Sequence, residues 1–275
     1  MRPLLVCCNL LGKFAAVAVW HQSHWAAVGC FIAPDLALLY GILAPASQLL
    51  CPVVTSFRPQ PGRPEVWLTI DDGPDPADTP QILDLLDRHG ARATFFAIGR
   101  RAEEHPGLIL EIARRGHQIG HHTHTHPQGT FWIAGPKRVR FELDRAAAAL
   151  RAADPAPTVF RPPVGIKNLF LRTELARRRM TCIGWTIRSG DCFARNPRRI
   201  TERVLRELRP GAIVLVHEGP SVPSGVRVVF LAELLAEISA RGYACVIPAP
   251  RQWLPPAATG STAGVASDGR QTRPA

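Results

Sequence analysis

A short apolar run at residues 66–70 is followed at once by two carboxylates, Asp71 and Asp72. Its β-branched and aromatic residues favour a strand, and Gly73 and Pro74 then force the chain to turn. Because side chains alternate in direction along a strand, the two aspartates must face different surroundings. One can therefore bind a metal ion while the other takes up a proton. A solvated Asp-Asp-Gly-Pro turn is the simpler alternative, so the rest of the chain has to decide between them.

Strand-like and helix-like segments alternate downstream of this stretch. The predicted strands are residues 66–70, 93–98, 117–121, 159–161, 181–187, 213–216 and 243–247, and the predicted helices are residues 79–89, 103–115, 137–153, 168–179, 197–208 and 226–241. Strands that alternate with helices in this way predict an α/β fold, namely a parallel barrel. In such barrels the chemistry lies at the carboxyl ends of the strands.

Composition narrows the class of partner. Lysine and arginine number 33 against 22 acidic residues, which gives a net charge of +11 that lies mainly in residues 52–251. Such a surplus suits an anionic partner, for example a lipid headgroup or a phosphorylated substrate. We find no basic helix or aromatic-interleaved motif and therefore predict no nucleic-acid binding. The seven cysteines show no C-x-x-C spacing and are predicted to be free thiols, which weighs against an oxidising compartment.

The start of the chain contains two apolar runs, residues 4–20 and 26–50, joined by a polar turn that has a tryptophan at each end, Trp20 and Trp25. Tryptophan is enriched where helices meet a membrane interface. The pattern predicts an apolar helical hairpin, so residues 1–50 are a candidate membrane anchor.

Polar residues within the hairpin leave other interpretations open. Asn9 and Lys13 interrupt the first run, and a signal peptide or a soluble extension packed on the domain are the alternatives. If both runs insert, the basic residues Arg2, Arg58 and Arg63 flank the hairpin on its outer side, while its turn has none. The positive-inside rule then predicts that the catalytic domain lies on the cytoplasmic face of the membrane.

Changes in composition divide the chain into four parts. After the hairpin, residues 51–64 are rich in proline and are predicted to form a stiff linker. The alternating segments make residues 65–250 the catalytic domain. Residues 251–275 are rich in Ala, Gly, Ser and Thr and are predicted to be a disordered tail.

Histidines gather after the third predicted strand, where five of the ten in the chain lie between His117 and His126. Two imidazoles and one carboxylate form an open site for a divalent metal ion. If the loop makes a helical turn, His122 and His126 share a face, whereas a continuing strand would align them with His124. Pro127 and the neighbouring threonines favour a turn, so we predict His122 and His126 as the ligands.

Four motifs follow one another along the chain: T-I-D-D-G-P at 69–74, H-T-H-T-H-P at 122–127, R-P-P-V-G at 161–165 and V-L-V-H at 214–217. Together they resemble the polysaccharide deacetylase family, carbohydrate esterase family 4, which includes the nodulation-type chitooligosaccharide deacetylases. The resemblance covers residues 63–250. It implies a distorted parallel (β/α)7–8 barrel that hydrolyses N-acetyl or O-acetyl groups on sugars.

The resemblance also implies a role for each motif residue. Asp71 would be the general base, and Asp72, His122 and His126 would hold a divalent metal ion, zinc or a similar ion such as cobalt. Arg161 would orient the base, the backbone N–H of Val164 would face the oxyanion, and His217 would be the general acid.

Departures from the family pattern point to a changed substrate. Val164 stands where a tyrosine is usual, so a ring is lost while the backbone N–H remains. The fourth motif usually ends in Asp-Trp but reads Arg-Ser-Gly-Asp-Cys at residues 188–192. Asp191 can still pair with Arg161, whereas the aromatic wall of the sugar site is expected to be missing. Glu218 replaces the usual aspartate after the last histidine.

All the bond-making groups are nevertheless present. We therefore predict a metal-dependent hydrolase that removes an N-acyl group, acetyl or formyl, from an amino sugar. The hairpin and the basic charge favour a lipid-linked or membrane-proximal glycan as the partner, and the oligomeric state is not predicted. The alternatives are a soluble-type chitooligosaccharide or peptidoglycan N-deacetylase, an O-acetyl esterase, and an inactive glycan-binding module. The last would be expected to lose Asp71 or His217.

Overall fold

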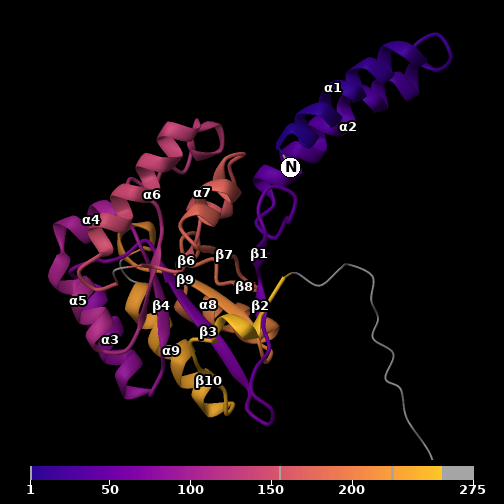
Figure 1. Ribbon diagram of the computed structural model, residues 1–275. Coiled ribbons are helices and arrows are strands. Elements are labelled where there is room, and N and C mark those ends of the chain that lie inside the picture. Colours follow the sequence, from indigo (N-terminus) through magenta and orange to yellow (C-terminus); the bar gives the residue numbers. More distant parts are fainter. Residues whose placement is uncertain (1, 155, 224–225, 256–275) are drawn as a thin grey trace, which may run out of the picture.

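A computed structural model describes residues 2–154, 156–223 and 226–255 of the protein (Figure 1). Most of the predicted disordered tail lies outside the described residues. A central parallel sheet carries helices on its outer side, and a pair of helices at the start of the chain projects away from this domain (Figure 1).

The sheet is parallel and curled. Its strands are β1 (Val53–Val54), β3 (Glu65–Asp71), β4 (Ala93–Ala97), β5 (Gln118–His121), β6 (Val159–Phe160), β7 (Thr181–Ile183), β8 (Ile187–Arg188) and β9 (Ile213–His217). They lie in the order β1-β7-β6-β5-β4-β3-β9-β8, and β10 (Ala244–Cys245) pairs with the start of β3. This curled parallel sheet confirms the predicted distorted parallel barrel. In the described chain the two ends of the order, β1 and β8, are not paired with each other, so the barrel is open between them.

The helices follow the predicted pattern with one break. They are α3 (Thr79–Arg88), α4 (Gly99–Glu104), α5 (Pro106–Arg114), α6 (Pro136–Leu150), α7 (Leu171–Arg177), α8 (Pro197–Glu207) and α9 (Arg227–Ala240). The single helix predicted at 103–115 is divided between α4 and α5, because Pro106 disfavours a helical conformation at His105. The strand predicted at 181–187 is likewise divided into β7 and β8.

Alternate side chains of β3 pack in two buried layers, one on each face of the sheet. Val66, Leu68 and Ile70 pack in the cluster that the sheet shares with the outer helices. Trp67 points to the opposite face, where it packs with side chains of neighbouring strands and its indole N–H donates to Thr94 at 2.7 Å. Asp71 lies four residues beyond Trp67 and therefore on the same inner face. The strand period thus places this carboxylate inside the curl of the sheet.

The Pro-rich segment does not form the predicted linker. Its strand β1 pairs with β7, and β2 (Ser56–Phe57) pairs antiparallel with β11 (Trp253–Leu254). Val53 and Phe57 are each only 2% exposed. Burying these apolar side chains against the domain stabilises the segment as an edge of the fold. The same pairing also orders residues 251–254, at the start of the predicted tail.

The first two helices, α1 (Arg2–Val19) and α2 (His24–Leu43), form the predicted hairpin. The hydroxyl of Ser23 caps α2 by accepting the N–H of Ala26. By length and composition, α2 is apolar enough to cross a bilayer, and its 20 residues would extend about 30 Å. The apolar part of α1 is shorter.

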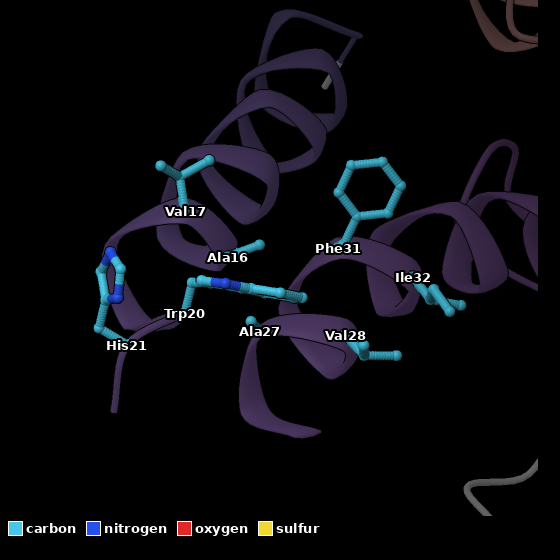
Figure 2. A pocket seen from close by; sticks show the side chains of 8 residues that line it. All are labelled: Ala16, Val17, Trp20, His21, Ala27, Val28, Phe31 and Ile32. Atoms are coloured by element: carbon cyan, nitrogen blue, oxygen red, sulfur yellow. The ribbon is translucent and has the colours of Figure 1, made fainter. Parts of the chain in front are cut away.

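Close packing and one ion pair hold the hairpin together. At Gly12 the helices approach so closely that a Cβ would lie 2.6 Å from the ring of Pro34. The ammonium of Lys13 pairs with the carboxylate of Asp35 at 2.7 Å. Near the tip, Figure 2 shows the ring of Trp20 between the two helices, where apolar side chains line a cavity of about 440 Å³.

Candidate active site and metal centre

The predicted site residues meet at the carboxyl ends of the strands. Asp71 and His217 are register partners on β3 and β9. A cavity of about 300 Å³ opens at this edge of the sheet, and its lining includes Asp71, Asp72, His122, His126, Val164 and His217. Arg161 and Asp191 are fully buried behind it. All eight predicted residues thus belong to one site.

Asp72, His122 and His126 bring three ligand atoms together. Oδ1 of Asp72 lies 3.4 Å from Nε2 of His122 and 3.2 Å from Nε2 of His126. The backbone adopts left-handed φ angles of 75° at Asp72 and 52° at His126. Such values are uncommon for non-glycine residues and typical of functional sites. His124 turns away toward Glu103 and the ring of Phe141, so the aligned-strand alternative does not hold.

The donor set fits a divalent cation. Oδ1 of Asp72 is buried without a hydrogen-bond partner, while Oδ2 accepts the hydroxyl of Ser221 at 2.6 Å. Nδ1 of His122 lies 2.7 Å from the carbonyl oxygen of Arg161. A carbonyl only accepts, so Nδ1 carries the proton and the Nε2 lone pair faces Asp72. Burial lowers the pKa of His126 to about 4, which keeps this imidazole in the neutral form that a metal ion requires.

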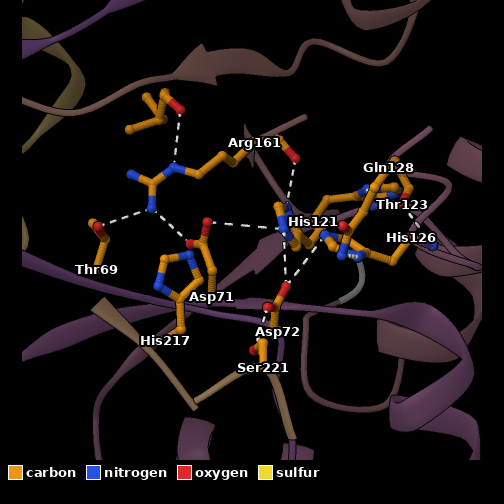
Figure 3. A network of polar contacts seen from close by, with 12 residues as sticks. Thr69, Asp71, Asp72, His121, Thr123, His126, Gln128, Arg161, His217 and Ser221 are labelled. Atoms are coloured by element: carbon orange, nitrogen blue, oxygen red, sulfur yellow. Dashed lines mark hydrogen bonds and ion pairs between the residues drawn. The ribbon is translucent and has the colours of Figure 1, made fainter. Parts of the chain in front are cut away.

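A buried arginine holds Asp71. Nη1 of Arg161 donates to Oδ1 of Asp71 at 2.6 Å and to the hydroxyl of Thr69 at 2.9 Å. The remaining nitrogens of Arg161 donate to the carbonyls of Ile183 and Gly184. Figure 3 shows Asp71 joined to Arg161 on one side and to the histidine cluster on the other. The guanidinium therefore fixes the orientation of this carboxylate.

Asp191 holds His217 and not Arg161, which corrects the prediction. Its carboxylate accepts from Nδ1 of His217 and from the backbone N–H of His217, both at 2.7 Å. The three guanidinium nitrogens of Arg161 donate instead to Asp71, Thr69 and the carbonyls of Ile183 and Gly184. Burial alone would disfavour the imidazolium, but the hydrogen bonds to Asp191 and Cys192 and the nearby carboxylates raise the pKa of His217 well above its usual value. The protonated form of His217 is thus favoured at the cavity wall.

Val164 occupies a strained position in the cavity wall. Its φ of 48° and ψ of 18° are left-handed, which is a genuine outlier for a β-branched residue. Its side chain is 45% exposed. At the neighbouring Gly165, a Cβ would lie 2.6 Å from the ring of Trp185 and 2.8 Å from Cβ of Pro45. Only glycine fits this junction, so the conformation around Val164 is tightly determined.

The aromatic wall is also present, although we expected it to be missing. Trp185 and Phe193 line the cavity, one on each side of the motif at 188–192. Neither position belongs to a motif that sequence analysis used, so only the folded chain reveals them.

Other supporting residues were missed for the same reason. Glu142 on α6 accepts the backbone N–H groups of His124 and Thr125 at 3.0 and 2.8 Å and thereby braces the histidine loop. Ser221 reaches Asp72 from the loop after β9. Glu218 is fully buried behind this loop, and burial raises its pKa to about 8.

Several known proteins are similar to this chain in sequence and fold. The family model described as polysaccharide deacetylase matches residues 58–183. A chitooligosaccharide deacetylase of Sinorhizobium fredii is 37% identical over 160 residues, which cover 58% of this chain and 74% of that protein. A peptidoglycan-N-acetylglucosamine deacetylase of Bacillus cereus is 33% identical over 180 residues, covering 65% of this chain and 83% of that protein. A crystal structure of a peptidoglycan N-acetylglucosamine deacetylase is 30% identical with a TM-score of 0.65, over 70% of this chain and 89% of that one.

Proposed function

The chain belongs to the polysaccharide deacetylase family, whose named relatives are hydrolases of carbon–nitrogen bonds, and we propose that it removes an N-acyl group from an amino sugar in a metal-dependent reaction. One observation carries the proposal. The orphaned oxygen of Asp72 faces two imidazoles in the same cavity as a carboxylate held by Arg161 and a histidine held by Asp191.

The proposed reaction divides the proton transfers between two residues. A divalent ion held by Asp72, His122 and His126, which we propose to be zinc, would polarise the acyl carbonyl and acidify water. Asp71 takes the proton of the water as its oxygen attacks the acyl carbon. His217 gives its proton to the amine nitrogen as the carbon–nitrogen bond breaks, because an unprotonated amine is a poor leaving group. The products are the free amino sugar and a carboxylic acid, acetic or formic.

Two further groups assist these steps. Arg161 keeps the carboxylate of Asp71 aimed into the cavity through the 2.6 Å hydrogen bond. The backbone N–H of Val164 is proposed to donate to the oxyanion that develops on the acyl oxygen. A donor aimed at such an oxyanion contributes about 3–4 kcal/mol to transition-state stabilisation.

We further propose that the hairpin anchors the domain to a membrane, with the domain on the cytoplasmic face. Large apolar side chains on both helices are exposed, among them Phe14 at 72% and Trp25 at 86%. Lys13 and Asp35 pair with each other, which lowers the penalty for placing either charge in lipid. The net charge of +11 adds attraction to anionic headgroups, at about 1 kcal/mol for each basic residue near the surface.

The root of the hairpin packs against the wall of the catalytic cavity. The ammonium of Lys167 donates to the carbonyls of Ala44 and Pro45 at 2.6 and 2.9 Å, just beyond the end of α2. Pro45 packs against Gly165, which lines the cavity beside Val164. An anchor attached at this point would hold the site close to the bilayer. This supports a lipid-linked or membrane-proximal amino sugar as the substrate.

A soluble glycan is the second candidate substrate. The relatives are named for chitooligosaccharides and peptidoglycan, and Trp185 and Phe193 offer rings on which a sugar can stack. This alternative requires no contribution from the hairpin.

The test compares substrates on the full-length protein in detergent. Release of acetate or formate is measured from a lipid-linked N-acyl amino sugar, from chitotetraose and from peptidoglycan. Activity should disappear with a chelator and return with zinc. Activity that survives complete metal removal would contradict the metal-dependent reaction. The proposal of membrane attachment is contradicted if the protein stays in the soluble fraction at low salt and prefers chitotetraose to the lipid-linked sugar.

A further inference from the structure

The catalytic cavity contains a cation that the protein itself leaves unpaired. Arg188, on β8, is exposed and lines the cavity together with Asp71 and Asp72. Within the described parts of the chain, no carboxylate forms an ion pair with its guanidinium. The carboxylates around it are engaged, because Asp71 is held by Arg161 and Asp72 faces the histidines. Its guanidinium is therefore free to meet an anionic group of a ligand that enters the cavity.

The fold holds Arg188 in a defined position. Its backbone pairs with Leu215, two residues before His217 on β9. Its guanidinium carbon lies 5.5 Å from the centre of the Phe193 ring. A cation–π contact of this kind orients the guanidinium without consuming its N–H donors. The side chain is thus placed at the cavity wall with its donors available.

We propose that Arg188 binds a phosphate group attached to the acylated amino sugar. This inference rests on the proposed function and specifies its substrate class. A guanidinium presents a planar fork of N–H donors that matches two phosphate oxygens. The hairpin root at the cavity wall makes a phosphate that joins the sugar to a lipid the expected source. A free sugar phosphate offers the same chemistry, so the experiment separates the two.

The experiment uses three substrates with the same N-acetylated amino sugar on the zinc-loaded, full-length protein in detergent. They are the neutral methyl glycoside, the sugar 1-phosphate and the undecaprenyl-phosphate-linked sugar. The measured quantity is the preference ratio, which is kcat/KM for a phosphorylated substrate divided by kcat/KM for the neutral one. The variants are Arg188→Gln, Arg188→Lys and the matched control Arg195→Gln, at an exposed arginine outside the cavity lining.

Losing a hydrogen-bonded charge contact should lower the preference ratio of Arg188→Gln by about 10- to 100-fold, mainly through KM. Arg188→Lys should retain part of the preference, and Arg195→Gln should match the wild type. A reduction for both phosphorylated substrates assigns the contact to the phosphate itself. A reduction confined to the lipid-linked substrate assigns it to the lipid phosphodiester. An unchanged ratio in Arg188→Gln overturns the inference, while hydrolysis of the neutral substrate leaves the proposed function standing.

A binding measurement keeps the two proposals separate. Titration calorimetry with glucosamine 1-phosphate, which has no acyl group to lose, should show affinity about 10-fold or more weaker in Arg188→Gln than in the wild type. If the wild type hydrolyses none of the three substrates, calorimetry alone tests the phosphate contact, and the proposed function is decided by the assays on chitotetraose and peptidoglycan. Equal affinity of the wild type and Arg188→Gln for glucosamine 1-phosphate would overturn the proposed phosphate contact.

Discussion

The two halves of the cavity use a buried carboxylate in opposite ways. Where β3 and β6 end, Arg161 holds the carboxylate of Asp71 at 2.6 Å. Where β9 ends, the carboxylate of Asp191 holds His217 at 2.7 Å. In the first pair the carboxylate faces the cavity and is oriented by a permanent cation. In the second the carboxylate lies behind and raises the pKa of the histidine that faces the cavity. In each pair, the member that lines the cavity, Asp71 or His217, is the one for which we propose a proton transfer.

The largest effect is expected from removing the proton acceptor. Asp71→Asn should lower kcat/KM by about 10²- to 10⁴-fold, because an amide does not accept a proton at neutral pH. The metal content should stay unchanged, since Asp71 is not one of the three proposed ligands. Hydrolysis assays measure the loss of activity, and elemental analysis measures the metal content. Full activity in the variant would remove Asp71 from the general-base role.

Removing one of the proposed metal ligands, which lie in the same half of the cavity as Asp71, should have the next largest effect. His126→Ala removes one of three ligands and should weaken metal binding by more than the roughly 10- to 100-fold typical of losing an outer-sphere partner. His124→Ala is the matched control, because His124 lies in the same loop but faces away. Metal titration monitored by elemental analysis compares them. Equal losses in both variants would mean that the ligand assignment is wrong.

In the half of the cavity that contains His217 and Asp191, we expect the main effect on the pH dependence of the reaction rate. We expect a bell-shaped pH–rate profile whose alkaline limb reports loss of the His217 proton. Asp191→Asn keeps an oxygen that can accept from Nδ1 but removes the negative charge, so the pKa of His217 should fall. The alkaline limb should then move to lower pH, while the acidic limb remains in place. A profile identical to that of the wild type would show that Asp191 does not tune the acid.

The smallest effect should come from the residue that links the halves. Ser221 lies in the loop after β9, yet its hydroxyl donates to Oδ2 of Asp72 at 2.6 Å. Ser221→Ala should weaken metal affinity by about 10-fold, the low end for an outer-sphere partner, without moving the pH profile. Competition with a chelator measures the affinity. Metal binding equal to that of the wild type would show that this hydrogen bond does not orient Asp72.

Contiguous motifs were readable from the amino-acid order because their function depends on local geometry. The apolar run before Asp71 predicts a strand, and the period of two places Asp71 on the inner face of the sheet. The turn expected before Pro127 brings His122 and His126 together and leaves His124 aside, and their ring centres lie 4.8 Å apart. The apolar runs around Trp20 and Trp25 predict the helical hairpin that is found.

Contacts between distant segments depended on how the strands pair. Asp191 could have reached Arg161 or His217, and the parallel pairing of β8 with β9 places it beside His217. Trp185 and Phe193 restore an aromatic wall from positions outside the motifs, while the Pro-rich segment becomes an edge strand because burying Val53 and Phe57 stabilises it there. The amino-acid sequence alone determined the strand ends, the proposed metal ligands and the family resemblance, since these arise within a few neighbouring residues. Only the tertiary structure decided the partners of Asp191 and Ser221, because strand register and packing bring these residues to His217 and Asp72 across the chain.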